Sequence, residues 1–419
     1  MLSRLLATAA CAALALGAAA ARTPEQVAEA ALRAAPVWDG HNDVPEQLRE
    51  RARNQIAAFD FADTRATADP AKDQIAMHTD LARLRQGRVG AQFWSVWVPT
   101  SLTEPQAIQA VLEQIDVTRR LIARYPADLQ LATTAREVEQ AMKAGRVASL
   151  IAMEGGHGIG TSLAVLRQMH ALGVRAMTLT HSRNTSFADS ATDAPKHNGL
   201  TPFGKDVVRE MQRLGMLVDL SHVSEKAMHD ALDVARAPVM FSHSGARAVA
   251  SHPRNVPDPV LARMKANGGI VMVVTLPDYV SDEVRAHANR RAGEKARLEA
   301  FHTGNPEAAK AALADWDRTN PVPRSTVAQV ADHIDHIVKL AGVDHVGIGA
   351  DFDGMSSATA GLDDVAGYPA LFVELARRGY GQAELEKIAS RNMLRVLRAA
   401  EAHAAARRAD PPIETPATF

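Results

Sequence analysis

The sequence predicts an α/β fold, a (β/α)8 TIM barrel, and three observations support this prediction. Short apolar runs alternate with helical patterns along most of the 419 residues. Several runs are apolar throughout rather than at every second residue, as expected of parallel strands that are buried on both faces. Most runs also stop at an ionisable residue, and barrel proteins carry their chemistry at the carboxyl ends of the strands.

Eight runs are predicted to be strands, because each is short, apolar and bounded by turn-forming or polar residues. They cover residues 36–38, 91–98, 147–153, 174–180, 215–220, 238–242, 268–275 and 345–350. Helical patterns are found at residues 23–35, 73–84, 104–124, 161–171, 201–214, 224–235, 257–266, 327–340, 368–378 and 382–399. Ser224 is expected to cap the helix that follows it, and Thr161 or Ser162 should cap the helix at 161–171.

The two ends of the chain are predicted to lie outside the barrel domain, which should span residues 22–409. Residues 1–21 contain one basic residue, an apolar stretch and small residues before Arg22, which is typical of a secretory signal peptide. We therefore expect an exported protein, periplasmic or secreted. Residues 410–419 are polar and proline-rich, which predicts a disordered tail without a lipid-anchor signal.

The only cysteine, Cys11, lies in the predicted signal peptide. Thr8 stands where an aliphatic residue usually precedes a lipidated cysteine, so lipidation of Cys11 is disfavoured. The mature chain would then lack cysteine, and any metal would be bound by His, Asp and Glu. The formal net charge of -1 provides no basic field for nucleic acid, so this class of partner is not expected.

Residues 278–324 form a long charged stretch between the seventh and eighth strands. It is predicted to be a helical insertion, with helices at 283–301 and 306–316. Because it is attached to a connection between a strand and a helix, we expect it over the mouth of the barrel, as a lid or as an oligomer contact such as that of a homodimer. A solvated insertion without function is the open alternative.

Seven ionisable residues follow predicted strands and would meet at one end of the barrel: His41, Asp43, Glu154, His181, His222, His243 and Asp351. Burying so many imidazoles and carboxylates without partners would cost too much free energy, and bound metal ions explain them best. Two ions about 3.5–4 Å apart, bridged by a carboxylate and a water, fit this number of ligands. Imidazole and carboxylate ligands together favour zinc, although manganese or cobalt could substitute.

Glu154 is the expected bridging ligand, because it is the only carboxylate from the middle strands. His41 and Asp43 would then bind one ion, and His222 and His243 the other.

Eight short motifs support a more specific interpretation. They are Asp-Gly-His-Asn-Asp at 39–43, Gln-Phe-Trp-Ser-Val at 92–96, Met-Glu-Gly-Gly-His at 153–157, Leu-Thr-His at 179–181, Asp-Leu-Ser-His at 219–222, Phe-Ser-His-Ser at 241–244, Pro-Arg-Asn-Val-Pro at 253–257 and Gly-Ala-Asp-Phe-Asp-Gly at 349–354. Together they resemble the membrane (renal) dipeptidases, binuclear zinc enzymes of the amidohydrolase-like barrel class. The resemblance extends in order from about residue 38 to residue 399.

The resemblance implies zinc-dependent hydrolysis of dipeptides, including those with a D-residue at the C-terminal position, with two Zn2+ ions per chain. The five residues assigned above to the two ions match metal ligands of the family. His181 and Arg254 match substrate contacts, with His181 stabilising the oxyanion and Arg254 gripping the carboxylate. Asp351 matches the carboxylate that transfers a proton.

The chain departs from the mammalian enzymes of this family in lacking their anchor signal and disulfide cysteines and in carrying the 278–324 stretch. Membrane attachment and disulfide-linked dimers are therefore not expected, and the substrate range stays open. Another metal-dependent amidohydrolase, acting on lactams, N-acyl-D-amino acids or phosphoesters, is the alternative. Arg254 argues against a neutral phosphotriester, and the complete ligand set argues against a catalytically silent binding protein.

Other residues near these motifs are expected to have structural roles. Asp353 could compete with Asp351 for its role, and His157 should support the site without binding metal. Surface or packing roles are predicted for the others, with a pocket-lining role as the alternative for the last four: His333, His336, Arg183, Asn184, Trp94 and Trp97.

Overall fold

The structure is a computed structural model that describes residues 22–72 and 74–415. The predicted signal peptide, with Cys11, and the last four residues of the predicted tail lie outside these ranges. Nine parallel strands form one sheet. Their bounds are β1 Val37–Asn42, β2 Val89–Trp97, β3 Leu129–Leu131, β4 Val147–Glu154, β5 Val174–Thr178, β6 Leu217–Asp219, β7 Met240–Phe241, β8 Ile270–Val273 and β9 Val346–Ile348.

The sheet closes on itself, which confirms the predicted barrel. The strand order is β2-β1-β9-β8-β7-β6-β5-β4, and β4 pairs back onto β2. β3 lies outside this ring and pairs only with the first half of β4. The strands β8 and β9 are buried along their whole length, as their continuous apolar sequences predicted, and β1 and β4 are equally buried although each contains at least one ionisable residue.

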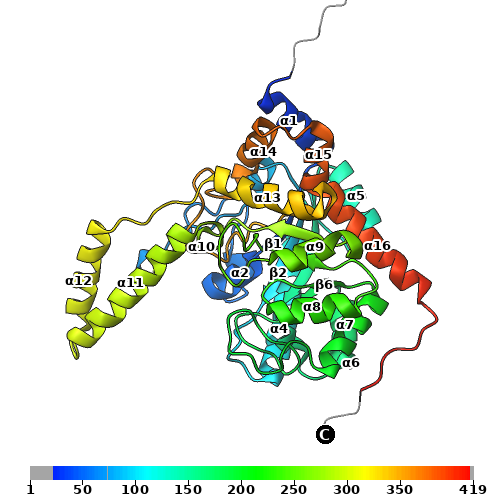
Figure 1. Cartoon of the computed structure of the whole chain (residues 1–419), viewed down its shortest axis with the longest axis horizontal. Helices are drawn as coiled ribbons and strands as arrows, with labels where there is room; N and C mark the ends of the chain where they lie inside the picture. Colours follow the sequence, from blue (N-terminus) through cyan, green and yellow to red (C-terminus); the bar gives the residue numbers. More distant parts are fainter. Residues whose placement is uncertain (1–21, 73, 416–419) are drawn as a thin grey trace, which may run out of the picture.

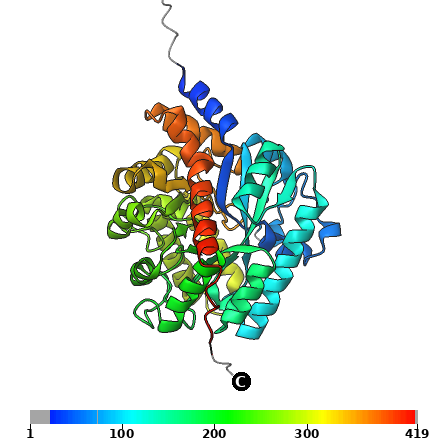
Figure 2. The same cartoon turned by 90° about the vertical axis from the view of Figure 1, so that its right-hand side faces the viewer.

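Helices surround the barrel on the outside (Figure 1, Figure 2). Those up to β8 are α1 Pro24–Ala34, α2 Val44–Ala52, α3 Leu81–Gln86, α4 Glu104–Arg124, α5 Ala135–Lys143, α6 Leu163–Ala171, α7 Pro202–Leu214, α8 Glu225–Val234 and α9 Asp258–Asn267. Those after it are α10 Pro277–Val280, α11 Asp282–Phe301, α12 Pro306–Thr319, α13 Val327–Ala341, α14 Tyr368–Arg377, α15 Gln382–Glu386 and α16 Asn392–Ala406. Ser224 caps α8 as predicted, and Ser162 rather than Thr161 caps α6.

Two predicted helices differ from the structure. The predicted helix at 73–84 is wrong over most of its length, because Asp80 is extended and its carboxylate caps the short α3 by accepting from the backbone of Arg83. The predicted helix at 382–399 is interrupted by a π-helical turn at Lys387–Arg391, between α15 and α16. The sequence prediction missed α2, β3 and α5, although Thr134 and Glu137 form a readable capping box at the start of α5.

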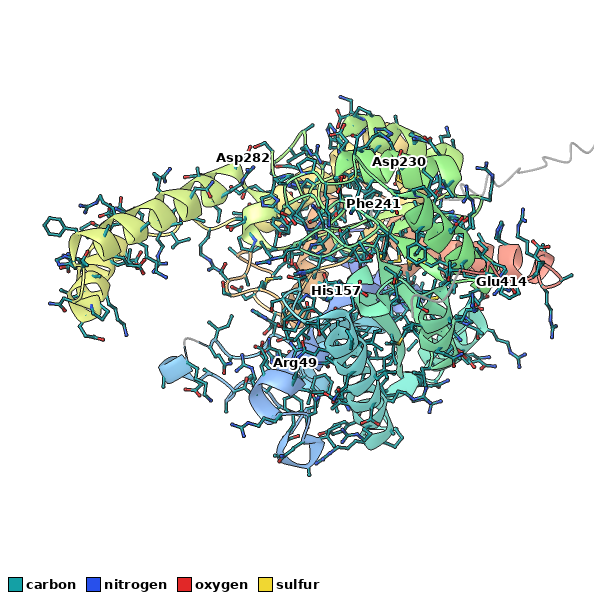
Figure 3. The ribbon with its side chains drawn as sticks, turned by 90° about the horizontal axis from the view of Figure 1, so that it is seen from below. Arg49, His157, Asp230, Phe241, Asp282 and Glu414 are labelled. Carbon is teal, nitrogen blue, oxygen red and sulfur yellow. The ribbon has the colours of Figure 1, made fainter. Side chains whose placement is uncertain are left out.

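The helices α11 and α12 form an arm that extends sideways from the barrel (Figure 1, Figure 3). They pack against each other through the pair formed by Arg291 and Asp317, with atoms 2.7 and 2.8 Å apart, and through the rings of His287 and Trp316. Both helices agree with the predicted ones. No residue of 282–324 lines the cavity described below, so the arm does not act as a lid in this conformation.

Residues 410–419 were predicted to form a disordered tail, and within its described part Ile413 contacts the barrel domain. The backbone of Ile413 donates to Glu210 at 3.2 Å and accepts from Arg167 at 3.1 Å. The side chain of Ile413 also packs on the hydrophobic core. Within the described residues, no helix combines the length and the apolar character that crossing a membrane requires.

Asp39, in the middle of β1, ties three elements together. Its carboxylate accepts from the backbone of His41 at 3.2 Å and of Ala350 at 2.9 Å, and from the hydroxyl of Tyr368 at 2.7 Å. Burial raises the pKa of Asp39, and these three donors oppose that increase. The carboxylate therefore joins β1, the end of β9 and α14 where the site begins.

Replacing Tyr368 by Phe should lower the free energy of unfolding by about 1.5–3 kcal/mol, because the buried carboxylate of Asp39 loses a donor. Urea unfolding checks this. Tyr380→Phe is the matched control: its hydroxyl bonds to Asp335 in a partly exposed setting and should cost about 1 kcal/mol or less. Equal losses in the two variants would contradict the role given to Tyr368.

Candidate metal centre and substrate cavity

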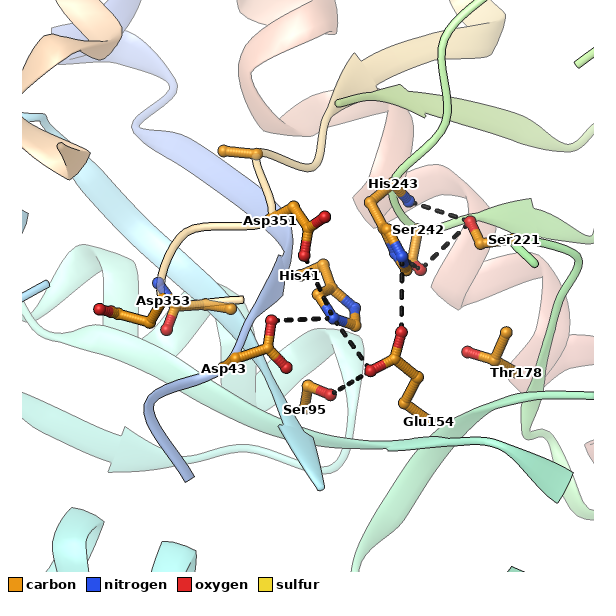
Figure 4. Close-up of polar contacts among 12 residues, drawn as sticks. His41, Asp43, Ser95, Glu154, Thr178, Ser221, Ser242, His243, Asp351 and Asp353 are labelled. Carbon is orange, nitrogen blue, oxygen red and sulfur yellow. Dashed lines mark hydrogen bonds and ion pairs between the residues drawn. The ribbon is translucent and has the colours of Figure 1, made fainter. Parts of the chain in front are cut away.

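The seven side chains predicted from the strand ends do converge, and Figure 4 shows His41, Asp43, Glu154, His243 and Asp351 among them. They sit at or just after the carboxyl ends of β1, β4, β5, β6, β7 and β9. Six of them line a cavity of about 490 Å³: Asp43, Glu154, His181, His222, His243 and Asp351. His41 belongs to the same cluster but does not line the cavity, and it is 2% exposed.

The backbone is strained where two of these side chains are placed. His222 has a φ of 68° and Asp351 a φ of 73°, both in the left-handed region. Such a conformation in a residue other than glycine costs of order 1–3 kcal/mol and persists only where the surroundings enforce it. At both positions it turns the chain sharply at a strand end and directs an ionisable side chain into the cavity.

Glu154 lies between two sets of ligands. Its Oε2 atom is 3.5 Å from His41 Nε2 and accepts from the hydroxyl of Ser95 at 3.2 Å. Its Oε1 atom is 2.9 Å from His222 Nε2 and 3.5 Å from His243 Nε2. The two oxygens of one carboxylate thus face different histidines, Oε2 facing His41 and Oε1 facing His222 and His243, which is the arrangement that the bridging prediction requires.

The buried polar atoms fit metal ions better than they fit each other. His41 Nε2 has no hydrogen-bond partner, although Asp43 Oδ2 lies 3.3 Å away. The Nε2 atoms of His222 and His243 face each other at 3.0 Å. Two nitrogens that bind one tetrahedral zinc at about 2.0–2.1 Å lie about 3.3 Å apart, so these two imidazoles converge as ligands of one ion would.

Three overlapping groups of three residues are found among the described residues, and within each group the donor atoms lie within 4.8 Å of one another. The groups are His41 with Asp43 and Glu154, Glu154 with His222 and His243, and His41 with His243 and Asp351. The first two groups match the pairs that were assigned to separate ions from the sequence. The third adds Asp351, which was assigned to proton transfer and lies 3.9 Å from His41 Nε2.

The electrostatics also favour metal ligation on the side of β6 and β7. Burial, followed by the charge of Arg254, holds the pKa of His222 well below its ordinary value. Burial and the neighbouring His41 do the same to the pKa of His243. Both rings are therefore neutral at pH 7, and a neutral imidazole has the free lone pair that a metal requires.

Asp219 and Ser242 fix the tautomer of His243. The hydroxyl of Ser242 donates to Asp219 Oδ2 at 2.5 Å and contacts His243 Nδ1 at 2.8 Å. Because Ser242 uses its only proton on Asp219, His243 Nδ1 must donate to the Ser242 oxygen. The proton therefore lies on Nδ1, and Nε2 is left as the ligand atom.

Asp219 also organises the surrounding backbone. It accepts from the amides of Ser221 at 3.0 Å and Ser242 at 2.9 Å, and from the hydroxyl of Thr178 at 2.6 Å. One buried carboxylate thus joins the ends of β5, β6 and β7. Sequence reasoning gave Asp219 no role, although it opens one of the motifs and follows an apolar strand.

Arg254 is a buried cation without an anion. It is 1% exposed and lines the cavity. Its guanidinium donates to Ser244 Oγ at 3.4 Å and to the carbonyl of His243 at 3.3 Å, while Nε has no partner. It lies over the ring of Tyr279, 5.3 Å from the centroid. Among the described residues no carboxylate oxygen lies within 4.0 Å of it.

His181 lies at the edge of the cavity, with a side chain that is 22% exposed. Its Nε2 atom is 3.9 Å from Glu154 Oε1, and its ring packs 5.3 Å from the ring of Trp97. Burial lowers the pKa of His181 and outweighs the opposing charge of Glu154. A neutral imidazole in this position can donate a hydrogen bond to an oxygen bound beside Glu154.

The residues expected to have structural roles mostly have them. Asp353 accepts from the backbone of His78 at 2.7 Å and lies apart from the metal ligands, so that of these two aspartates Asp351 lines the cavity and Asp353 does not (Figure 4). His157 bonds to the carbonyl of Val98. Asn184 holds its own loop by bonding to the carbonyl of Ala194.

Both histidines of α13 are structural, as predicted. His333 is buried and bonds to the backbone of Ala246 and Val280, and His336 pairs with Asp258. The two tryptophans differ from each other. Trp94 packs in the core, but Trp97, at the end of β2, lines the cavity, which was the alternative for that residue.

Replacing Ser242 by Ala should weaken metal binding by about 10- to 100-fold, because His243 Nδ1 loses the oxygen that fixes its tautomer. A zinc titration against a competing chelator measures this. Ser149→Ala is the control, since it removes a buried hydroxyl that bonds only to the backbone of Val147 in the same barrel. Unchanged affinity in Ser242→Ala would refute the tautomer assignment.

Comparison with known proteins agrees with this geometry. The family model for membrane dipeptidase (peptidase family M19) matches residues 25–410. The chain is 42% identical over 380 residues to dipeptidase tcpJ of Claviceps purpurea (strain 20.1). The aligned region covers 88% of this chain and 78% of that protein.

Two solved structures share the fold. The probable dipeptidase PvdM from Pseudomonas aeruginosa has a TM-score of 0.75 and 23% identity, covering 91% of this chain and 99% of that chain. A metallo peptidase from Rhodobacter sphaeroides, liganded with a phosphinate mimic of the dipeptide L-Ala-D-Ala, has a TM-score of 0.71 and 24% identity, covering 87% of this chain and 99% of that chain. From the family match across nearly the whole described chain and the level of identity to a dipeptidase, we conclude that this protein belongs to the membrane dipeptidase family, peptidase family M19, and is a metallo-dipeptidase.

Proposed function

We propose that this protein is a zinc dipeptidase whose substrates are defined by a free C-terminal carboxylate, including dipeptides with a D-residue at that end. The observation that carries the proposal is the buried guanidinium of Arg254, which faces the cavity without a carboxylate partner among the described residues. A buried charge requires compensation. A substrate carboxylate supplies it, and the planar fork of arginine suits a carboxylate in particular.

Five residues would hold two zinc ions. His41 and Asp43 would bind one ion, His222 and His243 the other, and Glu154 would bridge them through the two oxygens that already face these groups. When bound, such ions supply Lewis acidity, which acidifies water and polarises a carbonyl oxygen at neutral pH. Histidine and carboxylate ligands without cysteine are compatible with zinc.

The remaining residues of the cavity have separate tasks in hydrolysis. Arg254 holds the carboxylate and so fixes the position of the scissile peptide bond. His181, close to Glu154, donates to the oxygen on which negative charge develops. Asp351, whose Oδ1 atom lies 3.9 Å from His41 Nε2, accepts a proton from the attacking water and returns it to the leaving amine.

The proposal that a D-residue is accepted is supported by the Rhodobacter sphaeroides structure, whose ligand mimics L-Ala-D-Ala. Around Arg254 the cavity is bounded by His252, Leu276 and Tyr279. We also propose that the chain is exported and processed near Arg22, on the strength of its signal-like start.

Replacing Arg254 by Ala should lower kcat/KM for dipeptides. The expected loss of transition-state stabilisation is about 2–5 kcal/mol, the usual cost of breaking a desolvated charge pair. Arg254→Lys should restore only part of it, because a point charge cannot form the bidentate pair. The measurement is kcat/KM for L-Ala-L-Ala, L-Ala-D-Ala, their C-terminal amides and the matching C-terminally extended tripeptides. Wild type should cleave the two dipeptides and not the others.

Arg263→Ala is the matched control, because Arg263 of α9 pairs with Asp233 of α8 away from the cavity. It should retain wild-type kinetics, and metal content should be unchanged in all variants. Equal cleavage of the dipeptides, amides and tripeptides by wild type would overturn the carboxylate assignment and favour a broader amidohydrolase.

A further inference from the structure

One carboxylate that lines the cavity, that of Glu46, has no role in metal binding or proton transfer. Four acidic residues line the cavity: Asp43, Glu46, Glu154 and Asp351. Asp43 and Glu154 are assigned to metal ions and Asp351 to proton transfer. Glu46 is left, and it occupies the same enclosed space.

The start of α2 determines where Glu46 points. Asp43 precedes the first residue of α2, and Glu46 lies in the first turn. Residues three apart share one face of a helix, so Glu46 lies next to Asp43 on the side that faces the cavity. Glu50, one turn further along, is exposed to solvent.

The carboxylate of Glu46 is enclosed but poorly paired. Its side chain is 18% exposed, and it forms no hydrogen bond among the described residues. The nearest cation is Arg49, whose Nη2 atom lies 3.9 Å away. Arg49 is also engaged elsewhere: it donates to the carbonyl of Trp97 at 3.1 Å and lies over the ring of Trp97.

The surroundings of Glu46 favour a further positive charge. Burial and the neighbouring Asp43 raise the pKa of Glu46 to about 9. A cationic group that enters the cavity beside Glu46 would favour the ionised form of this carboxyl group and pair with it.

Glu46 and Arg254 lie on different sides of the cavity. Glu46 follows β1, whereas Arg254 contacts His243 and Ser244 beyond β7. The strands β9 and β8 separate β1 from β7 in the barrel. A carboxylate side chain and a guanidinium thus flank the metal ligands from two directions.

We propose that Glu46 binds the free α-ammonium group of the substrate's N-terminal residue. The inference rests on the proposed dipeptidase function and extends it to the other end of the substrate. In a dipeptide the ammonium and the carboxylate each lie one Cα atom away from the scissile peptide bond, on opposite sides. Arg254 and Glu46 would then bind the two charged ends of the substrate. Arg254 would exclude substrates that are extended at the C-terminus, and Glu46 those that are extended at the N-terminus.

The test compares L-Ala-D-Ala with propionyl-D-Ala, which has the same shape and peptide bond but carries hydrogen in place of the ammonium group. Wild type should prefer L-Ala-D-Ala in kcat/KM. Glu46→Gln should lower kcat/KM for L-Ala-D-Ala by about 10- to 100-fold, the usual effect of losing a charged hydrogen bond. It should leave the value for propionyl-D-Ala within about twofold of wild type.

Glu50→Gln is the matched control, because it removes an exposed carboxylate from the same helix and should keep the wild-type preference. Calorimetry with a phosphinate mimic of L-Ala-D-Ala adds a readout without turnover, and its Kd should rise in Glu46→Gln while metal content stays the same.

If Glu46→Gln keeps the wild-type preference and Kd, the inference is overturned and the dipeptidase proposal stands. If wild type cleaves propionyl-D-Ala as fast as L-Ala-D-Ala, the inference is also overturned. If wild type cleaves neither L-Ala-D-Ala nor L-Ala-L-Ala, the proposed function itself fails.

Discussion

The position of the Glu154 carboxylate between the imidazole of His41 and the imidazoles of His222 and His243 is the interaction on which the site depends. One oxygen faces His41 and the other faces His222 and His243, at distances of 2.9–3.5 Å. Without positive charge at this point, buried carboxylates and imidazoles would have to be neutral or paired at a cost of several kcal/mol. The closed parallel barrel supplies the geometry, because it brings the ends of distant strands to one rim.

Two further aspartates hold that rim in shape, although neither faces the cavity. Asp39 joins β1, the end of β9 and α14, and Asp219 joins the ends of β5, β6 and β7. Each satisfies backbone amides that would otherwise be unpaired where the strands stop. The left-handed backbone at His222 and Asp351 is strained, and such supporting contacts are what allow it to persist.

Much of the fold and of the metal site could be predicted from the sequence, for a physical reason. Strands that are buried on both faces must be apolar throughout, so a histidine or carboxylate directly after one stands out. That signal found His41, Glu154, His222 and His243, which the structure brings together.

The rest depended on side-chain direction, which the one-dimensional pattern does not contain. Asp219 and Ser242 contribute through hydrogen bonds between strands that are distant in sequence. Trp97 and Trp94 are similar in sequence context but point to different environments. Glu46 is one of several charged residues in 46–51, and only the start of α2 at Val44 shows that it faces the cavity. The helix at 73–84 failed because the cap at Asp80 outweighed a helical composition.

The most direct test of this account is the metal content of the purified protein, measured by elemental analysis for wild type and Glu154→Ala. The account predicts two zinc ions per wild-type chain, loss of activity on chelation and its return with zinc. It also predicts that Glu154→Ala weakens both sites together, because one carboxylate serves both. A fully active protein without metal, or a Glu154→Ala variant that holds two ions as tightly as wild type, would contradict it.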